Sequence, residues 1–252
     1  MNFPSGGVLA FSRSSEKRDV GSILVSLVIP MYNERDGLEM LFASIDNALS
    51  GRAIAYEVVC IDDGSSDDTF SALVDIGDKR IRAFRLSRNY GKEIALSAGL
   101  DLVRGDVVIP MDADLQEPPE LIPVMLDKWE QGFDVVVAVR RSRQADGFVK
   151  AASAKFFYKF FNSVSASKIP ENAGDFRLLD RHVVDVLRQM PERNRFMKGL
   201  LSWPGFRYEQ IEFDRPERYC GQSKWKPLKL LGLAVDGLTS FSTLPLRMAS
   251  IL

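Results

Sequence analysis

Through its first 140 residues the chain alternates short, almost continuous apolar runs with amphipathic stretches. The apolar runs are rich in Val and Ile, as is typical of strands that are buried on both faces of a sheet. The stretches between them repeat apolar residues at helical spacing; in Arg35–Leu49, for example, Leu38, Leu41 and Ile45 fall on one face. This alternation predicts an α/β fold with a mostly parallel sheet flanked by helices.

The expected strands are Ile23–Ile29, Tyr56–Ile61, Arg82–Leu86, Val107–Met111 and Asp134–Val139. The expected helices among them are Arg35–Leu49, one that starts near Asp67, Lys92–Val103 and Pro119–Gln131. The second half is less regular, and there we expect short helices at Asp180–Gln189, Asn194–Ser202 and Pro227–Ser240, with one alternating strand at Phe206–Phe213.

Length and composition limit the functional classes. The 252 residues suffice for one large domain, and the net charge of −1 gives no reason to expect a nucleic-acid partner. The two cysteines make no zinc-site spacing. We expect a flexible leader over 1–22, one domain over 23–225 and a membrane-adjacent amphipathic segment over 226–252.

Ligands of open α/β sheets bind beyond the carboxyl ends of the strands, and the unusual residues of this chain lie there. The strongest signal is Asp112-Ala113-Asp114-Leu115-Gln116, directly after the fourth strand. Two carboxylates at positions i and i+2 are suited to one divalent cation that also holds substrate phosphates. A solvated acidic turn has the same pattern, so the position at a strand end is what favours a metal.

Two further loops follow the first and second strands. Tyr32-Asn33-Glu34 offers an aromatic ring and a carboxylate to a base, and Asp62–Asp67 is acidic with a turn glycine. Both are also explained by turns and helix caps. The chain has neither G-x-G-x-x-G nor a Walker loop, so a bound diphosphate needs a metal and basic side chains.

Taken in order, these motifs resemble the family 2 glycosyltransferases with the GT-A (Rossmann-like) fold. Within them the chain is similar to the polyprenyl-phosphate glycosyltransferases, the relatives of dolichol-phosphate mannose synthase and bactoprenol glucosyltransferase. The resemblance covers the chain from about Val25 onward. It is carried by Val-Ile-Pro-Met-Tyr-Asn-Glu (28–34), Ile-Asp-Asp-Gly-Ser-Ser-Asp (61–67), Arg-Asn-Tyr-Gly-Lys (88–92), Asp-Ala-Asp-Leu-Gln (112–116), Gly-Asp-Phe-Arg-Leu-Leu (174–179) and Arg-Tyr-Cys-Gly-Gln-Ser-Lys-Trp (218–225).

The resemblance implies a role for each matching residue. The nucleotide-sugar site would consist of Pro30, Tyr32, Glu34, Asp62, Lys92, Asp112 and Ala113. The metal, Mg²⁺ or Mn²⁺, would be held by Asp112, Asp114 and Gln116. The phosphate and acceptor contacts would be Arg140, Arg218 and Lys224. The catalytic residues would be Asp175 and Asp114.

Asp175 matches the family's candidate base. A lipid monophosphate has a second pKa near ~6 and is largely dianionic at neutral pH, so it needs little deprotonation. We therefore expect Asp175 to orient the acceptor or balance its charge as much as to remove a proton. An ordinary loop carboxylate paired with Arg177 is the structural alternative.

Two segments suggest a membrane surface. Lys150–Phe161 combines five aromatic residues with three lysines, and Leu228–Leu252 is amphipathic. A buried helix explains the first segment equally well. Relatives in this branch usually continue into two transmembrane helices, which this chain lacks, so we expect it to be part of a longer protein. The implied location is the cytoplasmic face of the cell membrane.

The expected reaction is an inverting, metal-dependent transfer of a hexose from a nucleotide diphosphate sugar to a polyprenyl (undecaprenyl) phosphate. UDP-glucose is the favoured donor; UDP-N-acetylglucosamine, UDP-galactose and GDP-mannose stay open, as does a homo-oligomer. The alternatives are a family 2 enzyme with a saccharide acceptor, a nucleotidyltransferase and a non-catalytic nucleotide-sugar module. Tyr32-Asn33-Glu34 is unlike the glycine-rich basic loop of nucleotidyltransferases, and intact Asp112, Asp114 and Asp175 argue against a decayed module.

Overall fold

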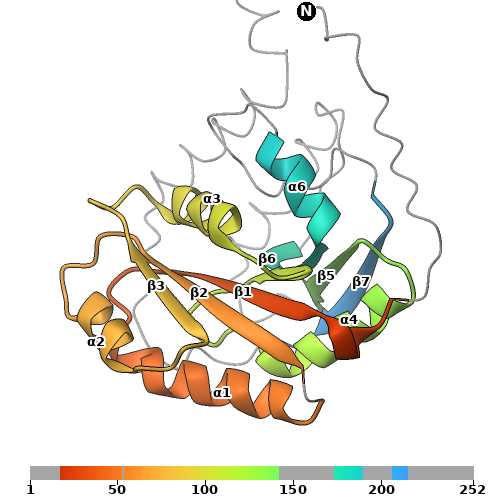
Figure 1. Ribbon diagram of the computed structural model, residues 1–252, viewed down its shortest axis with the longest axis horizontal. Helices are drawn as coiled ribbons and strands as arrows, with labels where there is room; N and C mark the ends of the chain where they lie inside the picture. The colour runs from red at the N-terminus through yellow and green to blue at the C-terminus, as the bar shows by residue number, and fades with distance from the viewer. Residues whose placement is uncertain (1–17, 53, 142–172, 190–205, 215–252) are drawn as a thin grey trace, which may run out of the picture.

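The protein was analysed as a computed structural model that describes residues 18–52, 54–141, 173–189 and 206–214. Within these ranges a seven-stranded sheet forms the centre of the molecule, with strand order β3-β2-β1-β4-β6-β5-β7 (Figure 1). Every described pairing is parallel except those of β6, which runs antiparallel to both β4 and β5. The predicted α/β fold with a mostly parallel sheet is confirmed.

The strands are β1 Leu24–Met31, β2 Ala55–Asp62, β3 Ile81–Arg85, β4 Val107–Pro110, β5 Val135–Arg140, β6 Ala173–Asp180 and β7 Tyr208–Phe213. The α-helices are α1 Leu38–Ser50, α2 Thr69–Asp75, α3 Lys92–Leu102, α4 Ile122–Glu130 and α6 Arg181–Gln189. Three short 3₁₀ turns are η1 Val20–Ser22, η2 Arg35–Gly37 and η3 Pro119–Leu121.

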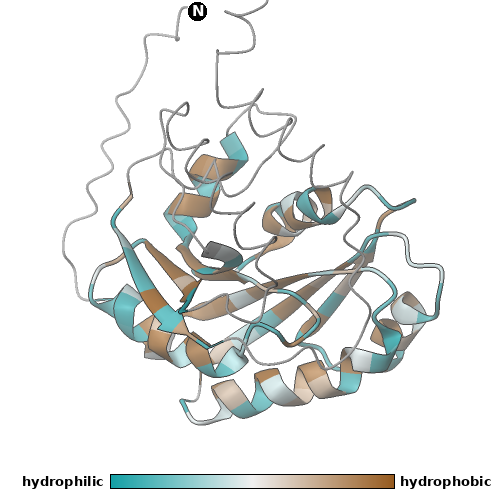
Figure 2. Ribbon diagram, turned by 180° about the vertical axis from the view of Figure 1, so that it is seen from behind, coloured by the Kyte–Doolittle hydropathy of each residue, from teal (hydrophilic) through white to brown (hydrophobic). Residues whose placement is uncertain are grey.

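The helices cover both faces of the sheet. In Figure 1, α3 and α6 lie above it and α1, α2 and α4 lie below it. The strands alternate accordingly: in β1, Leu27 and Ile29 belong to the cluster packed on α1 and α4, and Val28 belongs to the cluster packed on α3 and α6. Figure 2 shows the apolar colour along the strands and on the helix sides that meet them. Burial on both faces is why these strands read as continuous apolar runs.

One strand was not predicted. β6 was recognised only as a motif, because Asp175 and Arg177 interrupt its apolar residues. In the structure Phe176, Leu178 and Leu179 are buried, and the chain inserts between β4 and β5. Arg177 is only 4% exposed and donates to the backbone oxygens of Gly174 and Asp175. Because its guanidinium is hydrogen-bonded to backbone oxygens of its own strand, the charged Arg177 side chain can be buried in the sheet.

Residues 18–22, which the sequence assigned to the leader, are packed against the domain. Arg18 donates to the backbone oxygen of Phe133 at 2.6 Å and to the Asp134 carboxylate at 2.8 Å. Arg18 also lies over the Trp129 ring, and Val20 is buried. Charge-assisted hydrogen bonds of this kind tie Arg18 to the end of α4 and the beginning of β5. Residues 1–17 lie outside the described residues.

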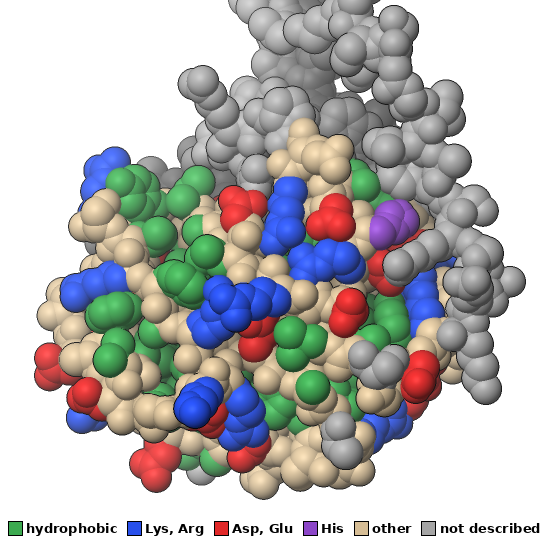
Figure 3. All heavy atoms as spheres, viewed as in Figure 1, with side chains coloured by type: hydrophobic (Ala, Val, Ile, Leu, Met, Phe, Trp, Pro, Cys, Tyr) green, Lys and Arg blue, Asp and Glu red, His purple; other side chains and the backbone are tan. Residues whose placement is uncertain are grey.

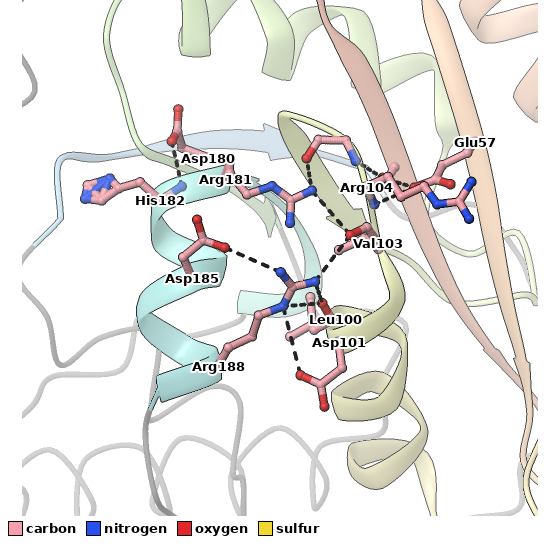
Figure 4. A network of polar contacts seen from close by, with 12 residues as sticks. Glu57, Leu100, Asp101, Val103, Arg104, Asp180, Arg181, His182, Asp185 and Arg188 are labelled. Carbon is pink, nitrogen blue, oxygen red and sulfur yellow. Dashed lines mark hydrogen bonds and ion pairs between the residues drawn. The ribbon is translucent and has the colours of Figure 1, made fainter.

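Helices α3 and α6 are joined by arginines (Figure 4). Arg188 Nε donates to the backbone oxygen of Leu100 at 2.9 Å, and Arg188 Nη2 reaches that of Val103 at 3.3 Å. Arg181 donates to the backbone oxygen of Gly105. These bonds satisfy acceptors that the end of α3 leaves open. They also hold α3 against α6, which directly follows β6.

Several expectations fall on residues that the structure does not describe: the helices at Asn194–Ser202 and Pro227–Ser240, the basic aromatic segment Lys150–Phe161 and the tail from Leu228. Among the described residues, no helix combines the length and apolarity that crossing a membrane requires. On the face seen in Figure 3, basic and acidic side chains of the described residues are interspersed.

Candidate active site

The polar loops that the sequence singled out lie along one edge of the sheet. β1 ends at Met31, β2 at Asp62 and β4 at Pro110, and these three strands are parallel neighbours. β6 runs the opposite way, so its beginning lies at that edge. Asp175 stands near the beginning of β6 and is thereby brought to the loop that follows β4.

Lys92 joins the two acidic parts of this site. Its Nζ lies 2.5 Å from Asp112 Oδ1 and 2.6 Å from Asp175 Oδ2. Lys92 is the first residue of α3, whereas the carboxylates come from the β4 loop and from β6. The Asp175 side chain is 13% exposed and the Lys92 side chain 35%, so the cluster is sheltered but open to solvent on one side.

The charges of the cluster perturb one another. Burial would lower the pKa of Lys92, but Asp175, Asp112 and Glu117 attract the ammonium and raise its pKa well above the ordinary value. Burial raises the pKa of Glu117 to about 8; repulsion from Asp112 and Asp175 adds to this, and Lys92 opposes it. Strongly perturbed ionisable groups that share a strand-end cluster are typical of a functional site.

The Asp112–Gln116 loop is tightly turned. Leu115 has a φ of +57°, which is unusual for a residue with a side chain. Asp114 Oδ1 accepts from the backbone nitrogen of Gln116 at 3.1 Å, and Glu117 Oε2 accepts from that of Asp112 at 2.8 Å. Strained backbone held by side chains clusters at ligand sites.

The loops after β1 and β2 are bonded to each other. The backbone nitrogen of Asn33, whose φ is +56°, donates to Ser65 Oγ at 2.9 Å, and Asn33 Oδ1 accepts from the backbone nitrogen of Ser66 at 2.9 Å. The backbone nitrogen of Glu34 donates to Thr69 Oγ1 at 3.0 Å. The two loops therefore form one wall of the site.

Asp62 and Asp63 have separate tasks. Asp62 is fully buried; its Oδ1 accepts from the backbone nitrogen of Ser65, and its Oδ2 lies 3.2 Å from Arg85 Nε. Asp62 Oδ2 has no hydrogen bond of good geometry within the described part of the chain, and the Arg85 guanidinium supplies its counter-charge. Asp63 accepts from the backbone nitrogens of Tyr90 and Gly91, at 2.7 and 2.8 Å, and so fixes the turn before Lys92.

The other predicted residues are distributed as follows. Pro30, Tyr32 and Glu34 are half-buried at the end of β1 and in its loop, and Ala113 is buried. Arg140 ends β5 at the same edge and is half-buried. Arg218 and Lys224 lie outside the described residues. Their expected roles stay predictions.

Sequence reasoning missed Glu117 and Asp63. Glu117 follows the acidic motif directly and resembles a surface residue before two prolines, although it is only 4% exposed. Asp63 looked like part of a helix-capping turn, but its carboxylate instead crosses to residues 90–91. Only the position of both residues beside strand ends could have drawn attention to them.

The donor chemistry of the β4 loop fits a divalent cation. In the described residues, no three His, Cys, Asp or Glu side chains are arranged as a ready metal cluster. Mg²⁺, however, usually takes one or two carboxylates and completes its shell with substrate phosphates and water. Lys92 between Asp112 and Asp175 also marks this place as one that takes positive charge.

Comparison with known proteins shows the family to which the chain belongs. Residues 26–188 match the family described as Glycosyl transferase family 2, more than half of the 252 residues. The chain belongs to this family. The match includes the loop with Asp112 and Asp114, the start of α3 with Lys92, and β6 with Asp175.

Similar proteins support the assignment. An uncharacterized glycosyltransferase of Synechocystis is 53% identical over 228 residues, 90% of this chain and 72% of that protein. A protein of Shigella phage SfV named bactoprenol glucosyl transferase is 45% identical over 225 residues, 88% of this chain and 73% of that one.

This family 2 glycosyltransferase also has a structural neighbour. The crystal structure of glucosyl-3-phosphoglycerate synthase from Mycobacterium tuberculosis, in complex with Mn²⁺, uridine diphosphate and glucosyl-3-phosphoglycerate, matches 86% of this chain and 80% of that chain. The TM-score is 0.55 and the sequence identity 18%. The likeness concerns the fold, which is of the expected GT-A type.

Proposed function

We propose that this glycosyltransferase transfers a hexose, with glucose favoured, from a nucleotide diphosphate sugar to a polyprenyl phosphate, with inversion at the anomeric carbon. The observation that carries the proposal is the meeting of Asp112 and Asp175 at Lys92, on the edge of the sheet where the parallel strands end and where open α/β sheets bind their ligands. The name of the phage relative, bactoprenol glucosyl transferase, supports the acceptor and the sugar.

On the donor side, Asp112 and Asp114, with Gln116, would hold Mg²⁺ or Mn²⁺. When bound, the cation neutralises charge that develops on the leaving diphosphate. The Mn²⁺ in the complex of the structural neighbour supports this choice for the fold. The joined β1 and β2 loops would receive the nucleoside, with Asp62 at the end of β2 beside them.

Lys92 would bind the diphosphate of the donor through its ammonium group. Its pKa is well above the ordinary value, so it stays positive at neutral pH. Because Lys92 stands at the beginning of α3, a shift of its long side chain lets the ammonium turn from Asp112 to an incoming phosphate without moving the helix. The ion pair with Asp112 then gives way to contacts with the donor.

On the acceptor side, a phosphate oxygen of the lipid attacks the anomeric carbon as the bond from that carbon to the diphosphate oxygen breaks. The nucleoside diphosphate leaves with the bonding electron pair. Asp175, half-buried beside Lys92, orients the acceptor phosphate and balances the charges around it, while Arg140, Arg218 and Lys224 supply positive charge. The reaction takes place at the cytoplasmic face of the membrane, where a lipid carrier and a soluble nucleotide sugar meet.

The experiment that tests this function is a partition assay. The protein is incubated with Mg²⁺, undecaprenyl phosphate and, in turn, radiolabelled UDP-glucose, UDP-galactose, UDP-N-acetylglucosamine and GDP-mannose. We expect label from UDP-glucose to enter the organic phase. Transfer to a soluble saccharide acceptor, with none to the lipid, would establish the rival family 2 function instead.

A further inference from the structure

Glu117 lies between the two halves of the site. It follows the β4 loop and precedes Pro118 and Pro119, and the prolines restrict the backbone on its far side. Its side chain turns back into the protein, where the residue is only 4% exposed. Burying a carboxyl group costs free energy, so a glutamate at this place is explained only by the contacts that it makes.

One carboxyl oxygen of Glu117 holds the metal-binding loop. Oε2 accepts from the backbone nitrogen of Asp112 at 2.8 Å. Asp112 stands two residues after the end of β4 and directly before the turn, so this bond fixes the point from which its own carboxylate reaches Lys92. The bond also spans the Leu115 position with its positive φ and so helps to maintain the tight turn.

The other oxygen faces β6. A Cβ atom added to Gly174 would lie 3.4 Å from Glu117 Oε1, so this oxygen borders the space in which a side chain at position 174 would begin. Gly174 is the residue before Asp175. Glu117 is thus hydrogen-bonded to the backbone of one acidic residue and its other oxygen faces the residue before the second, while Lys92 bridges the two carboxylates.

We infer that Glu117 is a positioning residue of this site: its carboxyl fixes the backbone of Asp112 and sets the spacing between the β4 loop and Asp175. The inference rests on the proposed function for its catalytic consequence. Glu117 acts through Asp112 and is not itself a ligand, in keeping with the lack of a three-residue metal cluster among the described residues. This role requires a side-chain oxygen that accepts a hydrogen bond and stands as far from the backbone as the carboxyl oxygens of glutamate do.

Two substitutions of Glu117 distinguish the effect of side-chain length from the effect of the carboxyl group's charge. Glu117→Gln keeps an oxygen acceptor at the same distance and removes the acid. Glu117→Asp keeps the acid but is one methylene shorter and cannot reach the Asp112 nitrogen from the same backbone. Glu120→Asp, at an exposed neighbouring position, is the matched control for shortening. Melting curves of the full chain establish that each variant is folded.

Two readouts are measured on the full chain. The first is hydrogen–deuterium exchange of the backbone amide of Asp112. The second is kcat and the donor KM for transfer to undecaprenyl phosphate. We expect Glu117→Asp to exchange faster at Asp112 and to lose about 10- to 100-fold in kcat, because misplaced ligand loops cost that much. Glu117→Gln should stay within about threefold of the unmodified protein.

The outcomes are decisive in either direction. A Glu117→Gln variant as impaired as Glu117→Asp would overturn the inference, because the charge would then matter rather than the acceptor. Glu117→Asp with unchanged exchange at Asp112 would overturn it as well. If the unmodified protein transferred no sugar to the lipid, the proposed function would fail, yet the exchange data would still decide the role of Glu117.

Discussion

Lys92 and Asp175 show how little of this site is local in sequence. The lysine begins α3, the aspartate stands in β6, and Asp112 follows β4, yet the lysine ammonium lies within hydrogen-bonding distance of both carboxylates. Neither carboxylate is buried without a counter-charge, which keeps its desolvation tolerable. At the scale of single residues, the site is an arrangement of charges that a donor and a cation would rearrange.

Asp175→Asn tests the division between donor and acceptor. The amide keeps the shape but removes the charge that faces Lys92. We expect turnover to fall by about 100-fold or more while nucleotide affinity changes little, since the proposed function places Asp175 at the acceptor. Turnover is measured by lipid partition and nucleotide binding by calorimetry. A matching loss of nucleotide affinity would contradict the assigned role.

Gly64→Ala tests the backbone of the β2 loop. Gly64 has a φ of +67°, and an added Cβ would lie 2.5 Å from the backbone carbon of Arg88. We expect the free energy of unfolding to fall by about 2 kcal/mol or more, because an alanine is strained at this φ and would also overlap the neighbouring backbone. Urea denaturation measures it. Gly37→Ala is the control, since a Cβ there meets nothing within 4 Å; equal losses in both variants would refute the argument.

At the scale of elements, α3 is the helix on which the site depends. Its beginning is fixed by Asp63 through residues 90–91, and its end by arginines of α6 (Figure 4). Lys92 can meet both carboxylates only if α3 keeps its distance from β4 and β6. The hydrogen bonds at the two ends of α3 therefore affect function by holding the helix, and with it Lys92, in place.

Arg188→Ala tests the far end of α3. The substitution removes the donors to the backbone oxygens of Leu100 and Val103. We expect a loss of about 1–3 kcal/mol in the free energy of unfolding, the usual value for a hydrogen bond to a charged group. Urea denaturation is the measurement, and Gln189→Ala, at an exposed neighbouring position, is the control. Indistinguishable midpoints for the two variants would show that the network contributes nothing.

The buried carboxyl group of Glu57 in β2 should make the stability of the fold depend on pH. Burial alone would raise its pKa, but hydrogen bonds from Ser26, the backbone of Arg104, and Arg82 outweigh burial and lower it below the ordinary 4.5. A carboxyl whose folded-state pKa is lowered contributes stability above its unfolded pKa and loses it as pH falls through the folded value.

Glu57→Gln should therefore be less stable than the unmodified protein at pH 7, and the gap should close as the pH falls below about 4.5. Melting temperatures from pH 7 to pH 3 give the comparison, with Glu39→Gln at an exposed site as the control. A gap that stays constant over this range would show that the Glu57 charge is not the cause.

β6 marks the limit of element prediction. The parallel strands were predicted because burial on both faces makes them apolar, as in β1 and β4. β6 begins with Ala173, Gly174 and Asp175, and its pairing with β4 and β5 comes from segments distant in sequence. Long-range pairing of a strand with charged residues leaves no periodic signal, so only the motif revealed that the segment matters.

At the scale of the whole molecule, the sequence identified the edge of the sheet that carries the candidate site but not the contacts within it. The ends of the predicted strands identify this edge of the sheet from the sequence alone, because parallel strands place their carboxyl ends together. The pairing of Lys92 with two carboxylates and the burial of Glu117 depend on side-chain directions that no spacing encodes. The resemblance supplied Lys92 and Asp175 as site residues, and the structure adds that they touch.

The most direct test of the whole account is a crystal structure of this protein with UDP and Mn²⁺, examined for the anomalous signal of manganese. We expect one ion beside the carboxylates of Asp112 and Asp114, at about 2.1 Å from an oxygen of each as for a magnesium-type site, with the diphosphate bound to it and Lys92 turned away from Asp112. A nucleotide bound at the strand ends with no ion near residues 112–114 would contradict the account.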